Sequence, residues 1–124
     1  MTYEETLHYL YTSIPVFQHS GASAYKPGLG TSIALDDYLG NPHKAYKTIH
    51  VAGTNGKGSV SHLLAAILRQ SGFKVGLYTS PHLVDFRERI RVNGKKISQD
   101  YVVDFVERHR SFFEPLYPSF FELT

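Results

Sequence analysis

The residues of this chain whose types and spacing best suit chemistry form a glycine-rich loop, Gly53-Thr54-Asn55-Gly56-Lys57-Gly58-Ser59. Its three glycines allow the backbone to approach a ligand closely and to point successive N–H groups at it. A stripe of apolar residues at helical spacing follows, so the positive end of a helix should face the same ligand. Lys57 adds a mobile cation. Together these features predict a binding site for nucleotide phosphates.

The loop departs by one step from the strict phosphate-binding-loop pattern. That pattern has a glycine five residues before the glycine of its Gly-Lys pair, and a Ser or Thr directly after the lysine. Here these positions hold Val51 and Gly58, and Ser59 lies one residue late for the usual magnesium hydroxyl. The alternative is a plain glycine turn between a strand and a helix. Closely spaced glycines lower stability through backbone entropy, which disfavours a turn that binds nothing.

A second candidate segment is Thr79-Ser80-Pro81-His82, which follows an apolar run over residues 74–79. If that run is a parallel strand, the segment lies at its carboxyl end, where open α/β sheets bind ligands. Pro81 restricts Ser80 to an extended backbone, which aims its side chain. Ser80 and His82 could then contact magnesium or phosphate. The alternative is an ordinary turn that ends the strand.

The elements that must position these residues alternate between strand and helix. Thr48–Ala52 is short, β-branched and apolar, as buried parallel strands are. The helix after the glycine loop should end at Gly72, before the strand over 74–79. Its apolar stripe consists of Val60, Leu63, Leu64, Ile67 and Leu68. This order predicts an α/β domain with a parallel sheet, a right-handed crossover and flanking helices.

Flanking segments predict further elements. Helical spacing predicts a helix over 3–12 that ends before Pro15, and a second helix that Thr31 or Ser32 caps and Gly40-Asn41-Pro42 ends. Strands over 89–92 and 95–97 should pair through a tight turn at Asn93-Gly94, and Ser98 should cap a last helix. A basic cluster is either an exposed hairpin face or a surface that attracts an anionic tail: Arg87, Arg89, Arg91, Lys95 and Lys96.

Composition limits the class of protein. The 124 residues suffice for one domain at most, and 13 basic against 11 acidic residues give a net charge of +2. So small a charge is no argument for a nucleic acid or an acidic membrane as partner. Cysteine is absent, so disulfides and thiolate metal sites are excluded. The longest apolar run, Leu63 to Leu68, is far shorter than the ~20 residues that span a bilayer. We therefore expect a soluble, cytoplasmic protein.

The last residues, Phe120-Phe121-Glu122-Leu123-Thr124, are largely aromatic and apolar. A segment of this kind favours burial, since exposed apolar surface promotes aggregation. We therefore expect the chain to be the first part of a longer protein. A terminal strand that completes a sheet is the alternative.

The chain closely resembles the folylpolyglutamate synthase/dihydrofolate synthase family of the Mur ligase superfamily. The resemblance lies in long motifs that occur in the same order and at the same separation as in that family. The first motif runs from His50 through the glycine loop to Val60. The others are Gly76-Leu77-Tyr78-Thr79-Ser80-Pro81-His82-Leu83 and Glu88-Arg89-Ile90-Arg91-Val92-Asn93-Gly94. The departure from the strict phosphate-loop pattern is itself the form that this family has.

The resemblance implies a role for individual residues. The ATP phosphates would be held by Gly53, Thr54, Asn55, Gly56, Lys57, Gly58 and Ser59, with Lys57 as the catalytic residue that bridges the terminal phosphates. Ser80 would bind Mg²⁺. Three parts of the chain would bind the substrate: His82, the segment Ser119, Phe120, Phe121 and Glu122, and the segment Thr12, Ser13, Ile14 and Pro15. In the last of these segments the sequence departs from the family's pattern. An aromatic face in the first group could stack on a flat pterin ring.

The family's reaction is an ATP-dependent amide ligation through an acyl phosphate, with dihydropteroate or folates and L-glutamate as substrates. The resemblance implies that residues 1–124 are the N-terminal part of a Mur-ligase-like ATP-binding domain with a phosphate loop. The rest of that domain, the C-terminal domain and further metal ligands would then be missing. It also implies a monomer when full length. A different phosphate-loop NTPase, such as a small kinase or GTPase, and a fragment that only binds nucleotide or pterin remain as alternatives.

Overall fold

The computed structural model describes residues 1–14 and 28–124, and the chain divides into two compact units. Unit 1 comprises Met1–Thr48 and Asp100–Thr124, and unit 2 comprises Ile49–Gln99. The predicted glycine loop, the segment around Ser80 and the hairpin all belong to unit 2.

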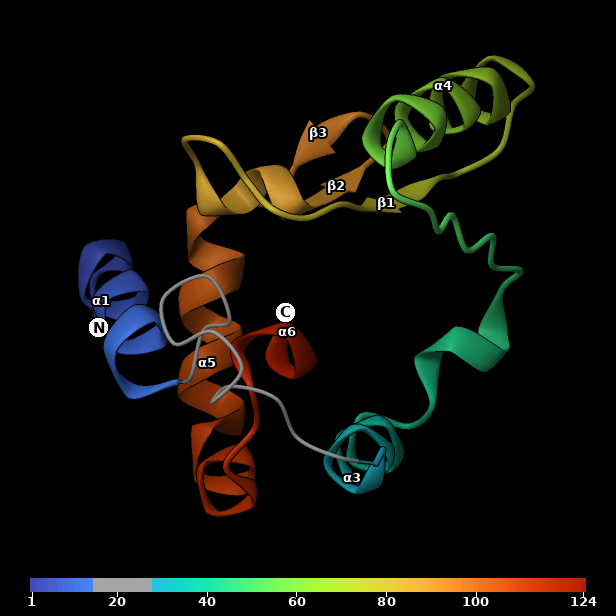
Figure 1. Ribbon diagram of the computed structural model, residues 1–124. Coiled ribbons are helices and arrows are strands. Elements are labelled where there is room, and N and C mark those ends of the chain that lie inside the picture. Colours follow the sequence, from blue (N-terminus) through green and yellow to red (C-terminus); the bar gives the residue numbers. More distant parts are fainter. Residues whose placement is uncertain (15–27) are drawn as a thin grey trace. The chain divides into compact units, whose positions relative to one another are not determined.

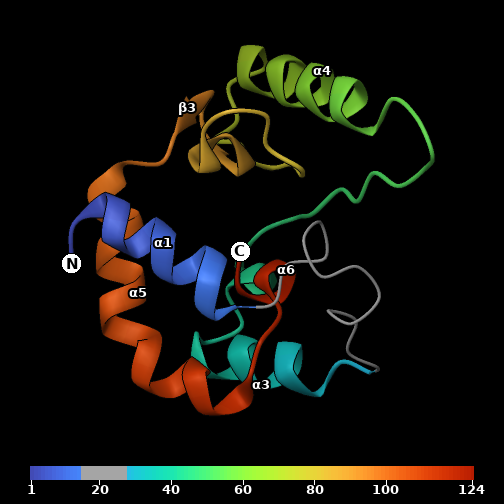
Figure 2. The same cartoon turned by 60° about the vertical axis from the view of Figure 1, so that its left-hand side comes forward.

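In the residues that the structure describes, unit 1 is built from helices and short 3₁₀ turns. These are α1 (Tyr3–Ser13), α3 (Gly30–Tyr38), η2 (Pro42–Ala45), α5 (Gln99–Phe113), η4 (Glu114–Leu116) and α6 (Phe120–Leu123). Figure 2 shows α1 running alongside α5, with α6 close to both. The buried apolar side chains described in this unit come from the same three helices, from Ile14 just after α1, and from Pro118 just before α6; those of the helices are Leu10, Val102, Val106, Phe113 and Phe120.

Ring and polar contacts join the helices of unit 1. Tyr9 on α1 donates a hydrogen bond to the Glu114 carboxylate over 2.8 Å, and its ring lies 6.5 Å from that of Phe113. Burial and this carboxylate raise the pKa of Tyr9 to about 12. On α3, the Tyr38 ring stacks on Phe112 with centroids 3.8 Å apart. Aromatic side chains therefore fix how α1 and α3 pack on α5.

The two N-terminal helices form where helical spacing predicts them. The α1 helix begins with a capping box in which Thr2 accepts from the Glu5 backbone N–H and the Glu5 carboxylate accepts from Thr2. The prediction that Pro15 follows its end lies outside the described residues. The α3 helix begins at Gly30 after Leu29, which makes no side-chain cap, so the predicted cap by Thr31 or Ser32 is wrong. Its predicted end is confirmed, because Gly40 and Asn41 have positive φ.

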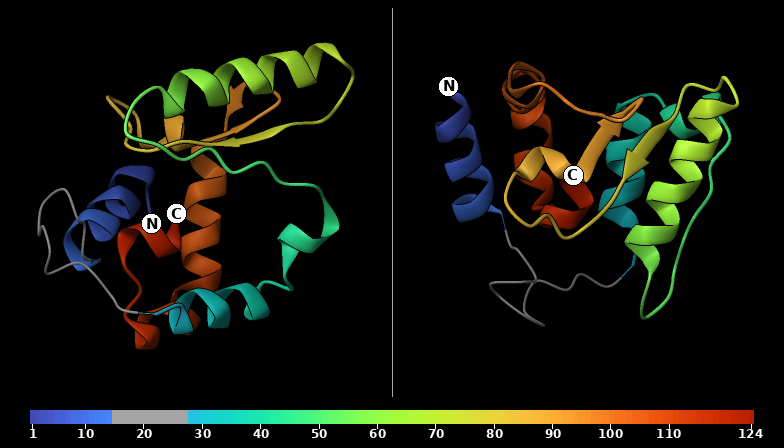
Figure 3. Two further views of the ribbon diagram at one scale, coloured as in Figure 1. Left: turned by 45° about the vertical axis from the view of Figure 1, so that its right-hand side comes forward. Right: turned by 90° about the horizontal axis from the view of Figure 1, so that it is seen from above.

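Unit 2 consists of one long helix and a small sheet. Its elements are α4 (Lys57–Gln70), β1 (Gly76–Tyr78), η3 (Phe86–Arg89), β2 (Ile90–Val92) and β3 (Lys95–Lys96). The strand order is β1-β2-β3, and both pairings are antiparallel, with Leu77 opposite Arg91 and Val92 opposite Lys95. The α4 helix lies over one face of these strands (Figures 1 and 3). Unit 2 is therefore a small α/β layer.

The predicted parallel sheet is wrong for the described residues. Thr48–Ala52 has no strand structure there, and the Ile49 side chain is 65% exposed. A strand needs a hydrogen-bonded neighbour, and β1 pairs instead with β2, which follows it after a short connection and runs in the opposite direction. An apolar run does not disclose the direction of its partner, so the sequence pattern could not distinguish the two arrangements.

The predicted hairpin turn at Asn93-Gly94 is confirmed, and it also fastens β1. Both residues have positive φ, of 50° and 79°, as a tight two-residue hairpin turn requires. Asn93 accepts a hydrogen bond from the Val75 N–H through its side-chain oxygen, and its own N–H donates to the Val75 carbonyl, each over 2.8 Å. One residue therefore closes the hairpin and fixes the register of the neighbouring strand.

The α4 helix is confirmed, and so is Gly72 as its end, with a φ of 92°. The Phe73 N–H donates to the Leu68 carbonyl, which is the hydrogen bond expected past a helix end with a glycine in this conformation. The apolar stripe is only half covered. Leu64 and Leu68 are half-buried, whereas Val60, Leu63 and Ile67 are 46%, 64% and 60% exposed. In the residues described, no helix is both long and apolar enough to cross a membrane.

Gly94→Ala should lower the free energy of unfolding by about 1–2 kcal/mol, because a φ of 79° is strained for any residue with a Cβ. The new Cβ would also displace the Arg69 guanidinium, whose Nη1 lies 2.1 Å from its position. Urea unfolding measures the change. Gly76→Ala is the matched control, since that glycine has no positive φ and its Cβ would meet no atom within 4 Å. Equal effects of the two changes would contradict this account of the turn.

Candidate functional site

The glycine loop leads into α4 through two glycines with positive φ. Gly53 has a φ of 150°, and Gly56, the residue that caps α4, has a φ of 77°. A glycine cap supplies no side-chain acceptor for the first N–H groups of a helix, which therefore remain available for a ligand. A Cβ at Gly56 would meet no atom within 4 Å, so the space beside the loop is open. The loop thus has the geometry of an anion site at a helix N-terminus.

The Lys57 side chain folds back over this loop. Its ammonium group donates to the Gly53 carbonyl over 2.5 Å and lies 3.5 Å from the Thr54 carbonyl oxygen. Thr54, Asn55, Gly58 and Ser59 are all exposed. The structure therefore brings the predicted phosphate-binding residues together at one end of α4, with a cation held above the loop and accessible to solvent.

The segment after β1 presents one exposed hydroxyl and one partly buried imidazole. Ser80 is exposed, whereas His82 is half-buried and its Nδ1 accepts a hydrogen bond from Arg89 Nε over 2.8 Å. Arg89 is itself only 3% exposed. Burial and the neighbouring Arg89 cation lower the pKa of His82. The imidazole is therefore held in a fixed orientation as a neutral ring, with the Nδ1 atom as acceptor.

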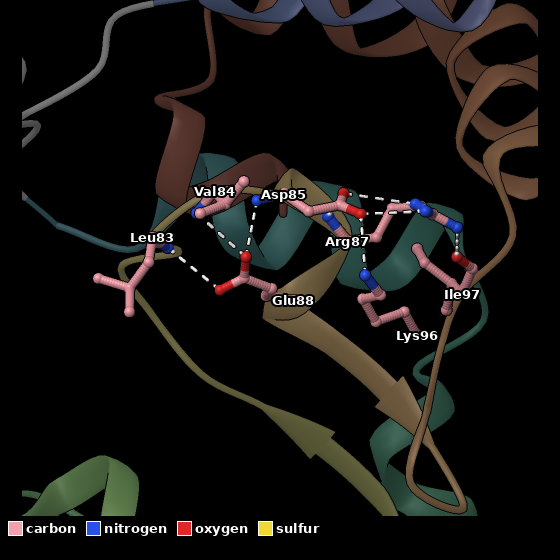
Figure 4. Close-up of polar contacts among 7 residues, drawn as sticks. All are labelled: Leu83, Val84, Asp85, Arg87, Glu88, Lys96 and Ile97. Atoms are coloured by element: carbon pink, nitrogen blue, oxygen red, sulfur yellow. Dashed lines mark hydrogen bonds and ion pairs between the residues drawn. The ribbon is translucent and has the colours of Figure 1, made fainter.

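Two carboxylates of the turn η3 organise the backbone beside His82 (Figure 4). Asp85 accepts from the backbone N–H of Arg87 over 2.9 Å and pairs with the Arg87 and Lys96 side chains over 3.0 and 3.1 Å. The Glu88 carboxylate accepts from three successive backbone N–H groups, those of Leu83, Val84 and Asp85. Three of the five residues of the basic cluster expected as an exposed hairpin face are therefore engaged: Arg87, Lys96 and the buried Arg89.

The remaining predicted residues belong to unit 1, which brings two of their segments together. The Tyr11 ring stacks on Phe120 with centroids 5.4 Å apart, so the end of α1 lies beside α6. Several groups here serve the fold: the Thr12 hydroxyl donates to the His8 carbonyl, and the Ser119 hydroxyl caps α6 by accepting from Glu122. Ile14 and Phe120 are buried, whereas Phe121 is 66% exposed. Ser13 is exposed and Glu122 half-buried, and Pro15 lies outside the described residues.

A groove of about 350 Å³ lies between α4 and the sheet. None of the predicted site residues lines it; its lining is His62, Ala65, Ala66, Arg69, Val75, Leu77, Arg91 and Gly94. Within residues 1–14 and 28–124, no three or more His, Asp or Glu side chains are grouped to hold a metal ion. The predicted metal site therefore rests on the Ser80 hydroxyl alone.

Sequence reasoning missed the residues that hold the segment after β1. Asp85 and Glu88 form a second capping box, and its Asp-x-x-Glu spacing is visible in the sequence. Arg89 was assigned to a surface cluster, although it is buried against His82. The ring stack of Tyr11 on Phe120 is likewise not predicted. The capping-box spacing could have identified the first pair, whereas the buried arginine and the ring stack carry no signal in one sequence.

Unit 2 is thus an α/β unit in which an open glycine loop leads into a helix that covers a small antiparallel sheet. Comparison with known proteins is more specific, although no protein-family model matches the chain. A probable bifunctional folylpolyglutamate synthase/dihydropteroate synthase of Haloferax volcanii is 40% identical over 98% of this chain and 14% of its own length. The dihydrofolate synthase/folylpolyglutamate synthase of Bacillus subtilis is 43% identical over 73% of this chain and 21% of its own length.

Solved structures agree with these relatives. The crystal structure of a Thermotoga maritima folylpolyglutamate synthase matches with a TM-score of 0.83 and 45% identity, over 98% of this chain and 28% of that one. An FPGS–AMPPCP–folate complex matches with a TM-score of 0.80 and 33% identity, over 99% of this chain and 30% of that one. The chain belongs to the folylpolyglutamate synthase/dihydrofolate synthase family, and it spans less than a third of the length of each of these four proteins.

Asp85→Asn should lower the free energy of unfolding by about 1–3 kcal/mol at pH 7, because it removes charge-assisted hydrogen bonds. Burial alone would raise the pKa of Asp85, but the Arg87 backbone N–H and the Lys96 and Arg87 side chains outweigh it and hold that pKa well below its usual range. Because the pKa of Asp85 is lower in the folded than in the unfolded chain, its charge contributes its full stabilisation above the unfolded-state pKa of about 3.9. The difference between wild type and variant should therefore be constant from neutral pH down to about pH 5 and shrink at lower pH.

Denaturant unfolding over a pH series measures this difference. Asp104→Asn is the control, because its ion pair with Arg108 lies on the surface, with side chains 54% and 70% exposed. Its removal should change stability by less than about 0.5 kcal/mol. A difference for Asp85→Asn that grows as the pH falls would contradict the charge of Asp85 assigned here.

Proposed function

We propose that this chain is the N-terminal part of the ATP-binding, Mur-ligase-like domain of a longer enzyme that joins L-glutamate to dihydropteroate or to a folate. The observation that carries the proposal is the open glycine loop at the N-terminus of α4, with Lys57 above it. Membership of the family, together with the small share of its relatives that the chain spans, supports it.

The loop residues fit the triphosphate of ATP. The backbone N–H groups from Gly56 onwards and the positive end of α4 would meet phosphate oxygens, and the first turn of the helix contains no acidic residue. Lys57 now donates to backbone carbonyls, and its flexible side chain can exchange these neutral acceptors for charged phosphate oxygens. Support comes from the FPGS complex that contains AMPPCP, an analogue of ATP.

Ser80 fits magnesium as one ligand of several. Mg²⁺ keeps several waters and is commonly bound by few protein groups together with substrate phosphates. Ser80 offers an exposed hydroxyl oxygen, and the remaining protein ligands would come from residues beyond this chain. When bound, the ion would offset the negative charge that develops between ATP and the substrate carboxylate.

Unit 1 would contribute contacts to the pterin ring. Phe121 presents an exposed aromatic face, and the stacked pair Tyr11 and Phe120 holds the neighbouring segment in place. Of the other predicted contacts, the hydroxyls of Thr12 and Ser119 already serve backbone hydrogen bonds. We therefore assign ring contact to Phe121 first.

The chemistry requires the protein mainly to position groups and to neutralise charge. A substrate carboxylate attacks the γ-phosphate of ATP and displaces ADP. The amine of L-glutamate then displaces phosphate from the resulting acyl phosphate and loses a proton. Lys57 would hold the terminal phosphates in line for the first step, and the loop amides would orient the rest of the triphosphate. An acyl phosphate hydrolyses in open water, so the reaction needs further parts of the enzyme to exclude solvent.

Lys57→Ala should weaken ATP binding tenfold or more, because it removes a charged partner of the phosphates, while the melting temperature stays within a few degrees. Isothermal titration with an ATP analogue measures the affinity, and thermal unfolding measures stability. Lys74→Ala is the matched control, since Lys74 is also exposed and belongs to unit 2. Unfolding of the Lys57 variant, or an equal loss of affinity in the control, would contradict the role of Lys57.

The full-length protein should form the glutamyl amide only with ATP, Mg²⁺ and L-glutamate together. Chromatographic detection of the product, with dihydropteroate and with a reduced folate as separate substrates, tests this.

Ser80→Ala should lower kcat and raise the Mg²⁺ concentration needed for half-maximal rate. Residues 1–124 alone should give no product. ATP hydrolysis without amide formation would instead indicate another phosphate-loop NTPase, and product from the isolated chain at a comparable rate would refute the proposed role of the missing parts.

A further inference from the structure

Two arginines and a histidine line the groove between α4 and the sheet, and no Asp or Glu of the described residues lines it. His62 and Arg69 lie about two turns apart on α4, and Arg91 lies on β2. The remaining lining residues are alanine, valine, leucine and glycine. Two cations beside such apolar surface repel each other more strongly than in water unless an anion lies between them. The groove therefore has the composition of an anion site.

Arg69 reaches from α4 across to the hairpin turn. Its guanidinium lies against Gly94, because a Cβ built on that glycine would lie 2.1 Å from Nη1 and 2.8 Å from Cζ of Arg69. The lack of a side chain at this turn position therefore leaves room for the cation. Among the described residues, no hydrogen bond or ion pair engages the Arg69 guanidinium.

Arg91 has a buried donor that lacks an acceptor. Arg91 and Leu77 are paired across β2 and β1, so their side chains lie on the same face of the sheet, and both line the groove. The Nε atom of Arg91 is buried and has no hydrogen-bond partner in the part of the chain that the structure describes. A buried donor of a charged group without an acceptor destabilises a fold, so we expect an acceptor to reach this atom.

The groove is separate from the glycine loop. Arg69 follows Lys57 by twelve residues on the same helix, which corresponds to about 18 Å along the helix axis. An anion beside Arg69 would therefore not touch the phosphates that we propose for the loop. The groove volume of about 350 Å³ lies within the range of about 300–1,000 Å³ that small-molecule sites have.

We propose that this groove is a second anion site, which binds a carboxylate or phosphate group between Arg69 and Arg91. A planar guanidinium donates parallel N–H groups that match two oxygens of either anion. The anion would accept from the unmet Nε of Arg91 on the sheet side and from Arg69 on the helix side. His62, on the same face of α4, can add a third polar contact. The bound anion would join α4 to the hairpin and so stabilise unit 2.

The test uses the full-length protein and two probes, inorganic phosphate and glutarate, each titrated at an ionic strength kept constant with chloride. The Nε–Hε NMR resonance of Arg91 reports on the site directly, and Arg91→Gln identifies this resonance by its disappearance. At least one probe should shift the resonance in a saturable manner. Saturation by phosphate alone would identify a phosphate site, and saturation by glutarate alone would identify a carboxylate site.

Arg69→Gln should raise the dissociation constant of the probe about tenfold or more, because it removes one of the two cations. Arg69→Lys keeps the charge but loses the paired donors, so it should raise the constant less. Lys95→Gln is the matched control, since it removes one positive charge from an exposed position of the same hairpin outside the groove. Its dissociation constant should stay within twofold of wild type, and so should that of Lys57→Ala, which alters only the glycine loop.

An Arg91 resonance that neither probe shifts would overturn the proposal. A carboxylate from another part of the longer protein that already fills the groove would give this result. Equal shifts with added chloride, or equal losses of affinity in Arg69→Gln and Lys95→Gln, would also overturn it. Thermal unfolding checks that each variant is folded. If Arg69→Gln is not, Arg69→Lys decides, and an affinity equal to that of wild type would then contradict paired donation by Arg69.

Discussion

Unit 2 depends on the pair of carboxylates in the turn η3. Glu88 accepts from the backbone N–H groups of the segment that leads into the turn, whereas Asp85, which caps the turn, accepts from the Arg87 N–H and also binds a side chain of β3. Without these acceptors, the amides of a loop between two short strands would have only water as partner. Because β2 begins directly after η3, the same turn sets where the hairpin starts. A three-residue strand makes few ladder hydrogen bonds, so its position is determined largely by such neighbouring contacts.

The glycine loop differs from this turn, because no side chain caps the amides at the start of α4. Gly53 and Gly56 have positive φ, and Lys57 donates to backbone carbonyls of its own loop. Unsatisfied groups of this kind lower the stability of a protein unless a ligand engages them. One unit therefore combines a backbone segment bonded to its own carboxylate with a loop that we propose as an anion site.

The sequence predicted the helices well, because amphipathic spacing and glycine signals are local. It placed α1, α4 and α5, the Gly72 helix end and the Asn93-Gly94 turn, and the glycine loop itself. It failed where partners decide the structure. Thr48–Ala52 has the composition of a strand but no neighbour to pair with in the part of the chain described, and the direction of β1 follows from β2. Arg89 could not be recognised as buried, because a charge adjacent to other charges has the pattern of a surface.

The exposed half of the α4 stripe gives this helix an uncovered apolar flank in addition to its uncapped first turn. Its fourteen residues form a rod about 21 Å long, with open amides at one end and uncovered aliphatic side chains along its flank. A helix moves as a rigid body, so a neighbour that packed on Val60, Leu63 and Ile67 would also fix where the first-turn amides stand. The position of the proposed phosphate-binding amides would then depend on hydrophobic packing on the side of the helix, without any contact between the packed side chains and the nucleotide.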